Sequence, residues 1–410
     1  MLVYDGAKIR QKFGIIKKYL YFCNVKKRIC FLIDSIFSYG GVQRVTAVIA
    51  KELAKDCDVT IVTFDDPSME NTALYELHEA DIHYRHFAYP NTSLWKESFC
   101  KAYSFLYKKV LPQNRLTSDW YSHSSFPSEK RDALAQELTK GKYDIIIGVH
   151  APLAVRLASC RNDLKGVKLI GWIHNSYDAL FGKGSLYIGP ELRKHYEWQL
   201  EKLDETVVLC NNDANRYHFQ TKVIYNPLTL NPGKPSEGCS KKFLAIGRFS
   251  PQHKGFDLLI QAFNLFAKED KEWTLDIVGE GVEEPIYREL IDKYHLQHRI
   301  TIHPFTNQVQ KYYSNAQIYV LSSRWEGMPL VLMEAMSHEL PIISSDLPVS
   351  KEIMGDFGLY FENGNVKQLA EQMKQATQMD WKKKSAEAIE IAKRFNIETI
   401  IGQWKEILNN

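Results

Sequence analysis

The sequence of 410 residues lacks the marks of a secreted or membrane-spanning chain. Its seven cysteines are odd in number, scattered and without a C-x-x-C pair, which indicates free thiols in a reducing compartment rather than disulfides or zinc ligands. No stretch approaches the ~20 uninterrupted apolar residues of a spanning helix. Lys17 and Lys18 interrupt the only apolar run near the N-terminus, so no signal peptide is recognisable. We therefore expect a cytoplasmic protein.

Patterns for a bound metal or a redox cofactor are also missing. Residues 56–58 spell D-x-D, which holds a metal in some enzymes, but they precede a predicted strand and so lie at the wrong end of a parallel sheet for ligand binding. No cluster of His, Cys and Asp elsewhere predicts a metal site. Residues 279–281 read Gly-Glu-Gly and lack the third glycine of the dinucleotide fingerprint. We therefore expect neither a metal nor a cofactor.

Length and charge indicate two domains with different surroundings. A chain of 410 residues is too long for one ordinary core and suggests two domains of about 200 residues. Residues 1–235 hold 32 Lys and Arg against 25 Asp and Glu, a net charge of +7, whereas residues 236–410 hold 20 against 24, a net charge of −4. This asymmetry predicts that the N-terminal half meets an anionic surface. Because no nucleic-acid motif accompanies the charge, we do not expect nucleic acid as the partner.

A basic N-terminal extension is predicted over residues 1–27. Through Arg28 it carries eight Lys and Arg against one acid, Asp5, interleaved with aromatic and aliphatic side chains. A basic helix with such an apolar face can lie in a membrane interface. The alternative is a solvated extension whose apolar face packs on its own domain.

Two series of alternating strands and helices follow the extension. In the first, strands are predicted at 28–34, 59–64, 82–84, 144–149, 167–173 and 206–209, with a helix at 42–55. Residues 91–131, rich in aromatic side chains and lysines, are predicted to be irregular. In the second, strands are predicted at 243–246, 274–278, 300–302, 318–321 and 341–344, with helices at 256–268 and 284–294. Such alternation is typical of parallel sheets covered by helices.

The sequence therefore predicts an α/β protein of two Rossmann-like, doubly wound parallel-sheet domains, at 28–225 and 241–390. Residues 226–240, rich in Pro, Gly and Ser, form the predicted linker. In such a pair, the ligand site lies in a cleft between the facing domains, at the carboxyl ends of both sheets.

The most informative stretch is 326–336, which reads E-G-M-P-L-V-L-M-E-A-M. Its proline and the Leu- and Met-rich run that follows predict a helix beginning at Pro329 or Leu330. The N-terminus of this helix offers free backbone N–H groups to a phosphate, and the carboxylates of Glu326 and Glu334 can accept hydrogen bonds from sugar hydroxyls. The alternative is that the glutamates only complement the helix dipole.

Further candidates follow other predicted strands. Gly40 and Gly41 come after the first strand, where glycine lets the backbone approach a ligand closely. His174 closes a strand of the first domain, and a structural role is its alternative. Arg248 and Lys254 follow the first strand of the second domain, where an arginine fork and a lysine can clamp a diphosphate.

These motifs resemble the retaining GT-B glycosyltransferases of the family 4 type. The resemblance rests on Gly-Arg at 247–248, Lys-Gly at 254–255, Gly-Glu-Gly at 279–281, S-R-W-E-G-M-P at 323–329 with E-A-M at 334–336, and P-I-I at 341–343 with Asp346. The run G-G-V-Q-R-V at 40–45 resembles the family's N-terminal glycine loop. Residues 394–404 resemble its final helix, which in this fold returns to the first domain, so a separate C-terminal helix is expected at 391–410.

The resemblance implies transfer of a sugar from a nucleotide donor with retention of configuration and without an obligatory metal. Two residues are implied as catalytic: Glu326 would hold hydroxyls of the donor sugar near the reacting carbon, and His174 would orient the sugar and stabilise the transition state. Glu334 would bind the ribose. The residues implied at the donor diphosphate are Arg248 and Lys254, with backbone groups of Gly327, Met328, Pro329 and Leu330. Gly40 and Gly41 would contact acceptor or phosphate. In this family the departing phosphate is thought to take the acceptor's proton.

We therefore predict a hexosyltransferase that uses a nucleotide sugar, preferentially a UDP-sugar, and a saccharide acceptor. The acceptor is expected to be linked to a lipid such as undecaprenyl diphosphate, in the biosynthesis of a cell-surface polysaccharide such as capsule or O-antigen. The basic first half predicts a peripheral place on the inner face of the plasma membrane. The alternatives are a GT-B phosphorylase or epimerase, and a non-catalytic carbohydrate-binding assembly subunit. The missing signal peptide argues against an extracytoplasmic sugar-binding protein.

Three positions depart from the family's pattern. Glu339 stands where the family usually has Gly before Leu-Pro, and a left-handed backbone there would cost about 1 kcal/mol. Gln43 replaces a common Glu, and residues 348–350 lack a Gly often found there. The last two departures leave the acceptor contacts open.

Overall fold

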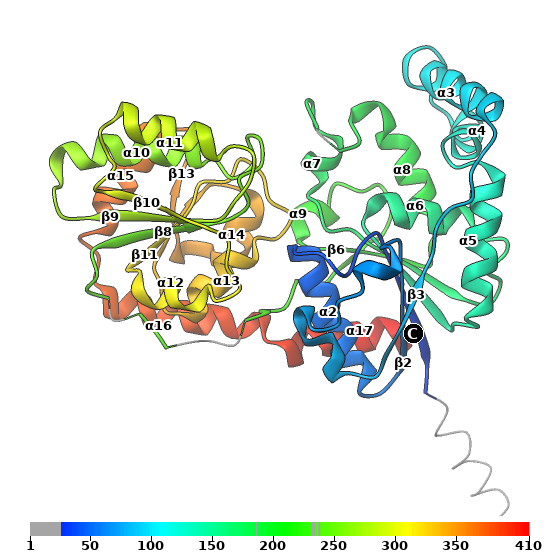
Figure 1. Ribbon diagram of the computed structural model, residues 1–410, viewed down its shortest axis with the longest axis horizontal. Coiled ribbons are helices and arrows are strands. Elements are labelled where there is room, and N and C mark those ends of the chain that lie inside the picture. The colour runs from blue at the N-terminus through cyan, green and yellow to red at the C-terminus, as the bar shows by residue number, and fades with distance from the viewer. Residues whose placement is uncertain (1–25, 186, 231–233, 237, 410) are drawn as a thin grey trace, which may run out of the picture.

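The computed structural model describes residues 26–185, 187–230, 234–236 and 238–409, so the predicted extension lies outside the described residues except for its last two positions. The described chain forms two α/β domains that lie side by side, each built on a parallel sheet covered by helices on both faces (Figure 1). The predicted fold class is confirmed.

Domain one contains a seven-stranded parallel sheet in the order β3-β2-β1-β4-β5-β6-β7. Its strands are β1 (Arg28–Ile33), β2 (Asp58–Thr63), β3 (Ile82–His86), β4 (Ile145–Val149), β5 (Lys168–Trp172), β6 (Glu205–Val208) and β7 (Lys222–Val223). The central strands are apolar at nearly every position because helices cover both faces of the sheet.

Domain two repeats the plan with six parallel strands in the order β10-β9-β8-β11-β12-β13. Its strands are β8 (Lys242–Ile246), β9 (Thr274–Val278), β10 (Ile300–His303), β11 (Ile318–Leu321), β12 (Ile342–Ser345) and β13 (Leu359–Phe361). In both sheets the strand order reverses beside the first strand, between β1 and β4 and between β8 and β11. Ligands bind at such switch points, outside the carboxyl ends of the strands.

The helices connect successive strands, except α15 (Val366–Ala376) and α16 (Trp381–Ala392), which follow the last strand. Those of domain one are α2 (Gly41–Ala54), α3 (Leu94–Lys109), α4 (Arg115–Ser125), α5 (Ser128–Lys140), α6 (Ala151–Ser159), α7 (Tyr177–Phe181), α8 (Arg193–Leu200) and α9 (Asn211–Ala214). Those of domain two are α10 (Phe256–Glu269), α11 (Glu284–Lys293), α12 (Gln310–Asn315), α13 (Leu330–Ser337), α14 (Pro348–Met354), α15 and α16. No helix among the described residues is long and apolar enough to cross a membrane.

The last helix, α17 (Ile397–Asn409), leaves domain two and packs on domain one (Figure 1). Its Trp404 ring meets Trp172 of β5 edge-on at a centroid distance of 4.7 Å. Lys168 Nζ donates to the Ile407 carbonyl at 2.6 Å, near the C-terminus of the helix. The C-terminal segment therefore joins the two domains a second time.

One secondary-structure prediction was wrong: residues 91–131 are helical rather than irregular, because they contain α3, α4 and the start of α5. Most large apolar side chains of α3 face solvent, and Tyr107 is its one buried residue, so the usual amphipathic pattern is largely inverted. One helix signal was present in the sequence. Asn114 and Thr117 form a reciprocal capping box at the start of α4.

Candidate active site

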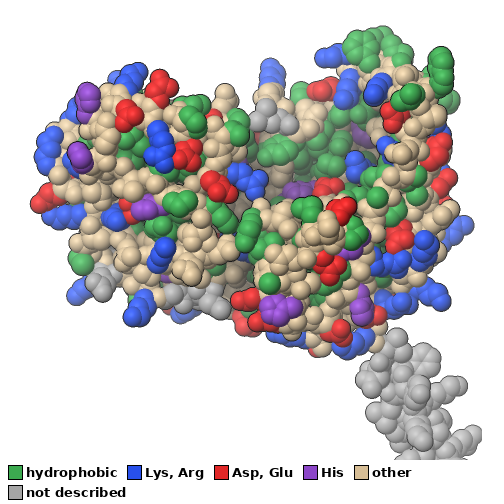
Figure 2. All heavy atoms as spheres, in the orientation of Figure 1, with side chains coloured by type: hydrophobic (Ala, Val, Ile, Leu, Met, Phe, Trp, Pro, Cys, Tyr) green, Lys and Arg blue, Asp and Glu red, His purple; other side chains and the backbone are tan. Residues whose placement is uncertain are grey.

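A cleft of about 1670 Å³ lies between the domains, and Figure 2 shows the hollow where the two lobes meet. Its wall is formed by residues that follow strands of both sheets, including β1, β4, β8, β9 and β11. Pockets for one small ligand usually enclose about 300–1,000 Å³. The cleft is therefore large enough for two substrates.

Most of the predicted site residues lie on this wall. Domain one contributes Gly40 and Gly41, and domain two contributes Arg248, Lys254, Glu326, Met328, Pro329, Leu330 and Glu334. Helix α13 begins at Leu330, and no side-chain hydrogen bond caps its N-terminus. The first backbone N–H groups of α13 therefore meet the cleft as a potential anion site.

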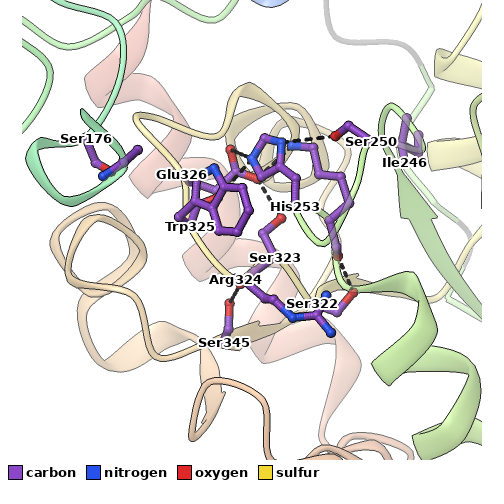
Figure 3. Close-up of polar contacts among 12 residues, drawn as sticks. Ser176, Ile246, Ser250, His253, Ser322, Ser323, Arg324, Trp325, Glu326 and Ser345 are labelled. Atoms are coloured by element: carbon purple, nitrogen blue, oxygen red, sulfur yellow. Dashed lines mark hydrogen bonds and ion pairs between the residues drawn. The ribbon is translucent and has the colours of Figure 1, made fainter. Parts of the chain in front are cut away.

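A network of side chains holds Glu326 in place (Figure 3). Glu326 Oε1 accepts from Lys254 Nζ at 2.7 Å and from Ser323 Oγ at 2.6 Å. The His253 ring stacks on Trp325 with 9° between the planes, and its Nε2 lies 3.8 Å from Glu326 Oε2. One carboxylate oxygen is thus fixed by two donors, while Oε2 remains the more open to a ligand.

The charge state of Glu326 follows from these neighbours. Burial alone would raise the pKa of its carboxyl, but the Lys254 ammonium and His253 outweigh burial and hold this pKa well below its usual range. Glu326 is therefore an anion at neutral pH, paired with a cation that also lines the cleft. The pair can meet both the hydroxyls and the phosphates of a ligand.

Glu334 is held by residues of both domains. Its carboxylate pairs with Arg44 of α2 in domain one, and its Oε2 accepts from Tyr313 Oη at 2.8 Å. The Glu334 side chain is 2% exposed and the Arg44 side chain 24%. A ribose bound to Glu334 would have to share this carboxylate with Arg44 or displace it.

Tyr39 makes a second connection across the cleft. Arg248 Nη2 donates to the Tyr39 carbonyl at 3.0 Å, and Asn307 Nδ2 lies 3.1 Å from the Tyr39 hydroxyl. The Tyr39 ring also meets Phe305 edge-on at 5.0 Å. Arg248 uses one of its five donors in this contact, so others remain to bind an anion.

Two predicted site residues, His174 and Gly327, are not on the wall. A Cβ atom at Gly327 would lie 2.0 Å from the His174 carbonyl oxygen, so the two residues pack against each other where the domains touch. Position 327 therefore has to be glycine for the domains to approach this closely. The His174 ring is buried against Trp172, at a centroid distance of 4.3 Å.

On the domain-one side of the cleft, the histidine on the wall is instead His150, which follows β4. Its ring lies 5.4 Å from that of His174. Burial lowers the pKa of His150 to about 4, and burial together with His150 lowers the pKa of His174 well below its usual value, so both are neutral at pH 7. The His150 backbone has φ 76° and ψ 150°, a conformation that strongly favours glycine. Such strain is concentrated at functional sites.

Asp34, Arg44 and His150 are among the wall residues that sequence reasoning missed. Asp34 follows β1 and His150 follows β4, and these strands are neighbours in the sheet. Burial raises the pKa of the Asp34 carboxyl. The positions of Asp34 and His150 directly after apolar strands were signals visible in the sequence. The sequence held no signal that pairs Arg44 with Glu334. In the described part of the chain, no group of three or more His, Cys, Asp and Glu side chains is placed to hold a metal ion.

Family models match almost the whole of the two domains. Residues 39–231 match the model described as Glycosyltransferase Family 4, and residues 231–395 match the model for Glycosyl transferases group 1. The boundary between the two matches falls in the predicted linker.

Curated relatives agree with these matches. An uncharacterized glycosyltransferase of Haemophilus influenzae is 27% identical over 394 residues, which cover 93% of this chain and 100% of the relative. The amylovoran biosynthesis glycosyltransferase AmsD of Erwinia amylovora is 28% identical over 221 residues, 50% of this chain and 62% of AmsD.

Solved structures show the same fold. TarM, known from S. aureus, superposes with a TM-score of 0.72 at 16% identity, covering 94% of this chain and 99% of TarM. Anabaena HepE bound to UDP superposes with a TM-score of 0.70 at 19% identity, covering 93% and 99% of the two chains.

Proposed function

The chain belongs to the GT-B glycosyltransferases of the family 4 type, and from this premise we propose that it moves a sugar from a UDP-sugar to a lipid-linked saccharide with retention of anomeric configuration. The reaction needs no obligatory metal in this proposal. The acceptor is assembled into a cell-surface polysaccharide at the inner face of the plasma membrane.

One observation carries the proposal: cations, an uncapped helix N-terminus and two carboxylates converge on one wall of the cleft. Arg248 and Lys254 bind the donor diphosphate, together with backbone N–H groups at the start of α13. Glu326 Oε2 accepts from hydroxyls of the donor sugar, and Glu334 accepts from the ribose. The two glutamates thus bind different parts of one elongated ligand, the sugar and the ribose.

The preference for UDP draws on solved neighbours. TarM and Anabaena HepE have been solved with UDP, HepE also with UDP-glucose, and the pneumococcal O-GlcNAc transferase GtfA with UDP and GlcNAc. All three superpose on this chain with TM-scores from 0.67 to 0.70 in these complexes. A UDP-sugar with a hexose or an N-acetylhexosamine is therefore the first donor to test.

The proposed reaction exchanges one bond at the anomeric carbon for another on the same face of the sugar. The bond to the diphosphate oxygen breaks, the bond to the acceptor oxygen forms, and the acceptor's proton passes to the departing phosphate. Arg248 and Lys254 stabilise the negative charge that develops on the leaving group. Because Glu326 Oε1 is bound by Lys254 and Ser323, the role given to Glu326 is to hold the sugar rather than to form a covalent intermediate.

Domain one binds the acceptor in this proposal. Asp34, His150 and Asn175 line its side of the cleft and offer a carboxylate, a neutral imidazole and an amide to acceptor or donor hydroxyls. We expect His150→Gln to lower kcat without shifting the acid limb of the pH–rate profile, since burial already keeps His150 neutral above about pH 4. A shift of that limb would contradict this role.

A role in polysaccharide assembly draws on the names of relatives. Amylovoran is the product named for AmsD, and O-antigen biosynthesis is named for WclY of Escherichia coli, which is 26% identical over 218 residues. The basic first half of this chain supports a lipid-linked acceptor, because lipid diphosphates lie in an anionic interface.

The test is an NMR assay of UDP-glucose and UDP-N-acetylglucosamine with the purified protein, with EDTA present and absent. The proposal predicts slow release of UDP and of a sugar whose first-formed anomer matches that of the donor, in both conditions. An inverted first product would contradict retention, and loss of release in EDTA would contradict metal independence. Release that requires added phosphate would favour a phosphorylase, and no release or binding would favour a non-catalytic subunit.

A further inference from the structure

Helices α3 and α4 form a hairpin whose outer face presents apolar side chains to solvent. The exposed fractions are 88% for Trp95, 74% for Phe99 and 62% for Trp120. The other large apolar side chains exposed there are Leu94, Phe105, Leu106, Val110 and Leu116. We call these eight residues the hairpin surface. The spacing of Trp95, Phe99 and Leu106 puts these three on one side of α3, and Val110 follows directly after the helix.

The hairpin has a separate core, so the hairpin surface is not needed to fold it. Tyr107, Tyr121 and Leu192 are buried together between α3, α4 and the segment before α8. The rings of Tyr107 and Tyr121 stack at a centroid distance of 4.6 Å. Apolar groups gathered on the opposite, exposed face are typical of an interaction site.

The charge around the hairpin surface is positive. Lys101, Lys108 and Lys109 lie on α3, and within the described chain none of the three forms an ion pair, whereas Lys96 is paired with Glu129. Figure 2 shows Lys and Arg side chains beside the apolar cluster at this end of domain one. Tryptophan, aliphatic side chains and unpaired lysines together are typical of a segment that enters the headgroup region of an anionic bilayer.

The hairpin core continues into the cleft. Ile188 and Tyr196 line the cleft and also pack against the core of the hairpin. Leu180 and Tyr187 lie on the same cleft wall, and Tyr187 is 56% exposed. In Figure 1, α8, which carries Tyr196, lies between the α3–α4 hairpin at one corner of domain one and α7 on the side that faces domain two. An apolar path therefore leads from the hairpin toward the acceptor side of the cleft.

We propose that the hairpin surface docks domain one onto an anionic phospholipid bilayer, with Trp95, Phe99 and Trp120 inserted among the headgroups. Docking by itself does not require the transfer reaction. The use of the wall at Leu180, Tyr187, Ile188 and Tyr196 to receive the lipid end of an acceptor does rest on the proposed function. A second copy of the chain suits the surface poorly, because a two-fold contact would bring the unpaired lysines of both copies together.

The test is flotation of the full-length protein with vesicles of three parts phosphatidylcholine to one part phosphatidylglycerol, and with phosphatidylcholine alone. We expect binding to the anionic vesicles that weakens at high salt. Lys101→Glu with Lys109→Glu should lower the partition coefficient by at least roughly 25-fold, since each lysine near such a surface contributes about fivefold and the two new carboxylates are repelled. Trp95→Ala with Phe99→Ala should lower it by about tenfold or more.

Matched controls separate this surface from other sources of binding. One control, Lys382→Glu with Lys383→Glu, reverses two exposed lysines of α16. The other, Val282→Ala with Ile286→Ala, removes two exposed apolar side chains of domain two. Each control variant should bind vesicles like the wild type. Every variant should keep the wild-type thermal shift with UDP, so a lost UDP response would concern the proposed function and not docking. The proposal would be overturned if the α3 variants float with the vesicles like the wild type. It would also be overturned if, among all variants, only Lys17→Glu with Lys18→Glu in the N-terminal extension loses vesicle binding. A wild-type dimer that the α3 variants convert to monomers would assign the surface to a second copy.

Discussion

Arg44 of α2 and Glu334 of α13 form an ion pair across the cleft, although the two residues are 290 positions apart in the sequence. The Glu334 carboxylate is buried, and its other partner is Tyr313. The pair joins the glycine loop of domain one to the helix whose N-terminus faces the cleft. Domain closure and the proposed ribose site therefore depend on the same carboxylate.

We expect Arg44→Met to lower the free energy of unfolding by about 2 kcal/mol, because a buried carboxylate loses a charged hydrogen-bond donor. Amide hydrogen exchange should also become faster at Gly40 and Gly41. The matched control is Lys55→Met, directly after the same helix, which loses only an exposed pair with Glu52 and should cost less than about 0.5 kcal/mol. Urea unfolding measures both, and equal effects of the two substitutions would show that the Arg44 pair adds nothing to closure.

Gly327→Ala tests how closely the domains approach. Its Cβ would lie 2.0 Å from the His174 carbonyl oxygen, and a backbone atom cannot move aside without separating the domains. We expect a larger radius of gyration by small-angle scattering and a loss of UDP-sugar turnover of about tenfold or more. The control is Gly402→Ala in α17, where an added Cβ meets no atom within 4 Å. That control should retain activity and gain about 1 kcal/mol of stability. Full activity in Gly327→Ala would refute the closed arrangement.

Glu326 should make stability depend on pH in a defined direction. Its folded-state pKa lies below the value of 4.5 expected in the unfolded chain, so its stabilising contribution is present above that value and is lost as pH falls below it. Near pH 7, Glu326→Gln should lower the free energy of unfolding by about 3 kcal/mol, because the Lys254 ammonium loses its partner.

This difference from the wild type should shrink as the pH is lowered below 4.5. The matched control is Glu390→Gln, which loses only an exposed pair with Lys393 and should differ from the wild type by less than about 0.5 kcal/mol at every pH. Denaturant titrations along a pH series measure all three proteins. A constant difference for Glu326→Gln across the series would mean that the carboxylate is not held in its charged form.

Local signals in the sequence were sufficient for part of the site. Pro329 and the apolar run after it predicted a helix that begins at Leu330, because the helix start is a property of neighbouring residues. The same holds for the parallel sheets, whose strands are continuous apolar runs. The helical spacing of Trp95, Phe99 and Leu106 in α3 was overlooked, and these apolar side chains face solvent rather than a core.

Tertiary relationships were beyond the reach of local signals. His150 and His174 both end strands, and only the packed structure shows that His150 lies on the wall while His174 is buried beside it. The ion pair between Arg44 and Glu334 could not be predicted, because the residues around each of them in the sequence give no information about the other. Gly327 was predicted as a donor-binding position, whereas the structure shows it at the point where the two domains touch.

The departure at Glu339 gives a prediction about stability alone. Its φ is 64°, as a left-handed C-terminal position requires, and the backbone N–H groups of Glu339 and Leu340 donate to Met336 and Ala335. We expect Glu339→Gly to raise the free energy of unfolding by about 1 kcal/mol, because glycine adopts this conformation without strain. UDP affinity should not change. A loss of stability in thermal or urea unfolding would show that the Glu339 side chain contributes more than its backbone costs.

The central claim is that the cleft binds the diphosphate of a nucleotide sugar through Arg248 and Lys254. The most direct measurement is calorimetric titration of the wild type and of Arg248→Ala with UDP and, separately, with uridine. The control variant is Arg288→Ala, which removes an exposed arginine of α11. We predict that Arg248→Ala weakens UDP binding by roughly 10- to 100-fold, as expected for loss of a charged hydrogen-bond donor. Uridine binding and the Arg288→Ala variant should match the wild type. Equal UDP affinity in Arg248→Ala and the wild type, or no UDP binding by the wild type, would contradict the claim.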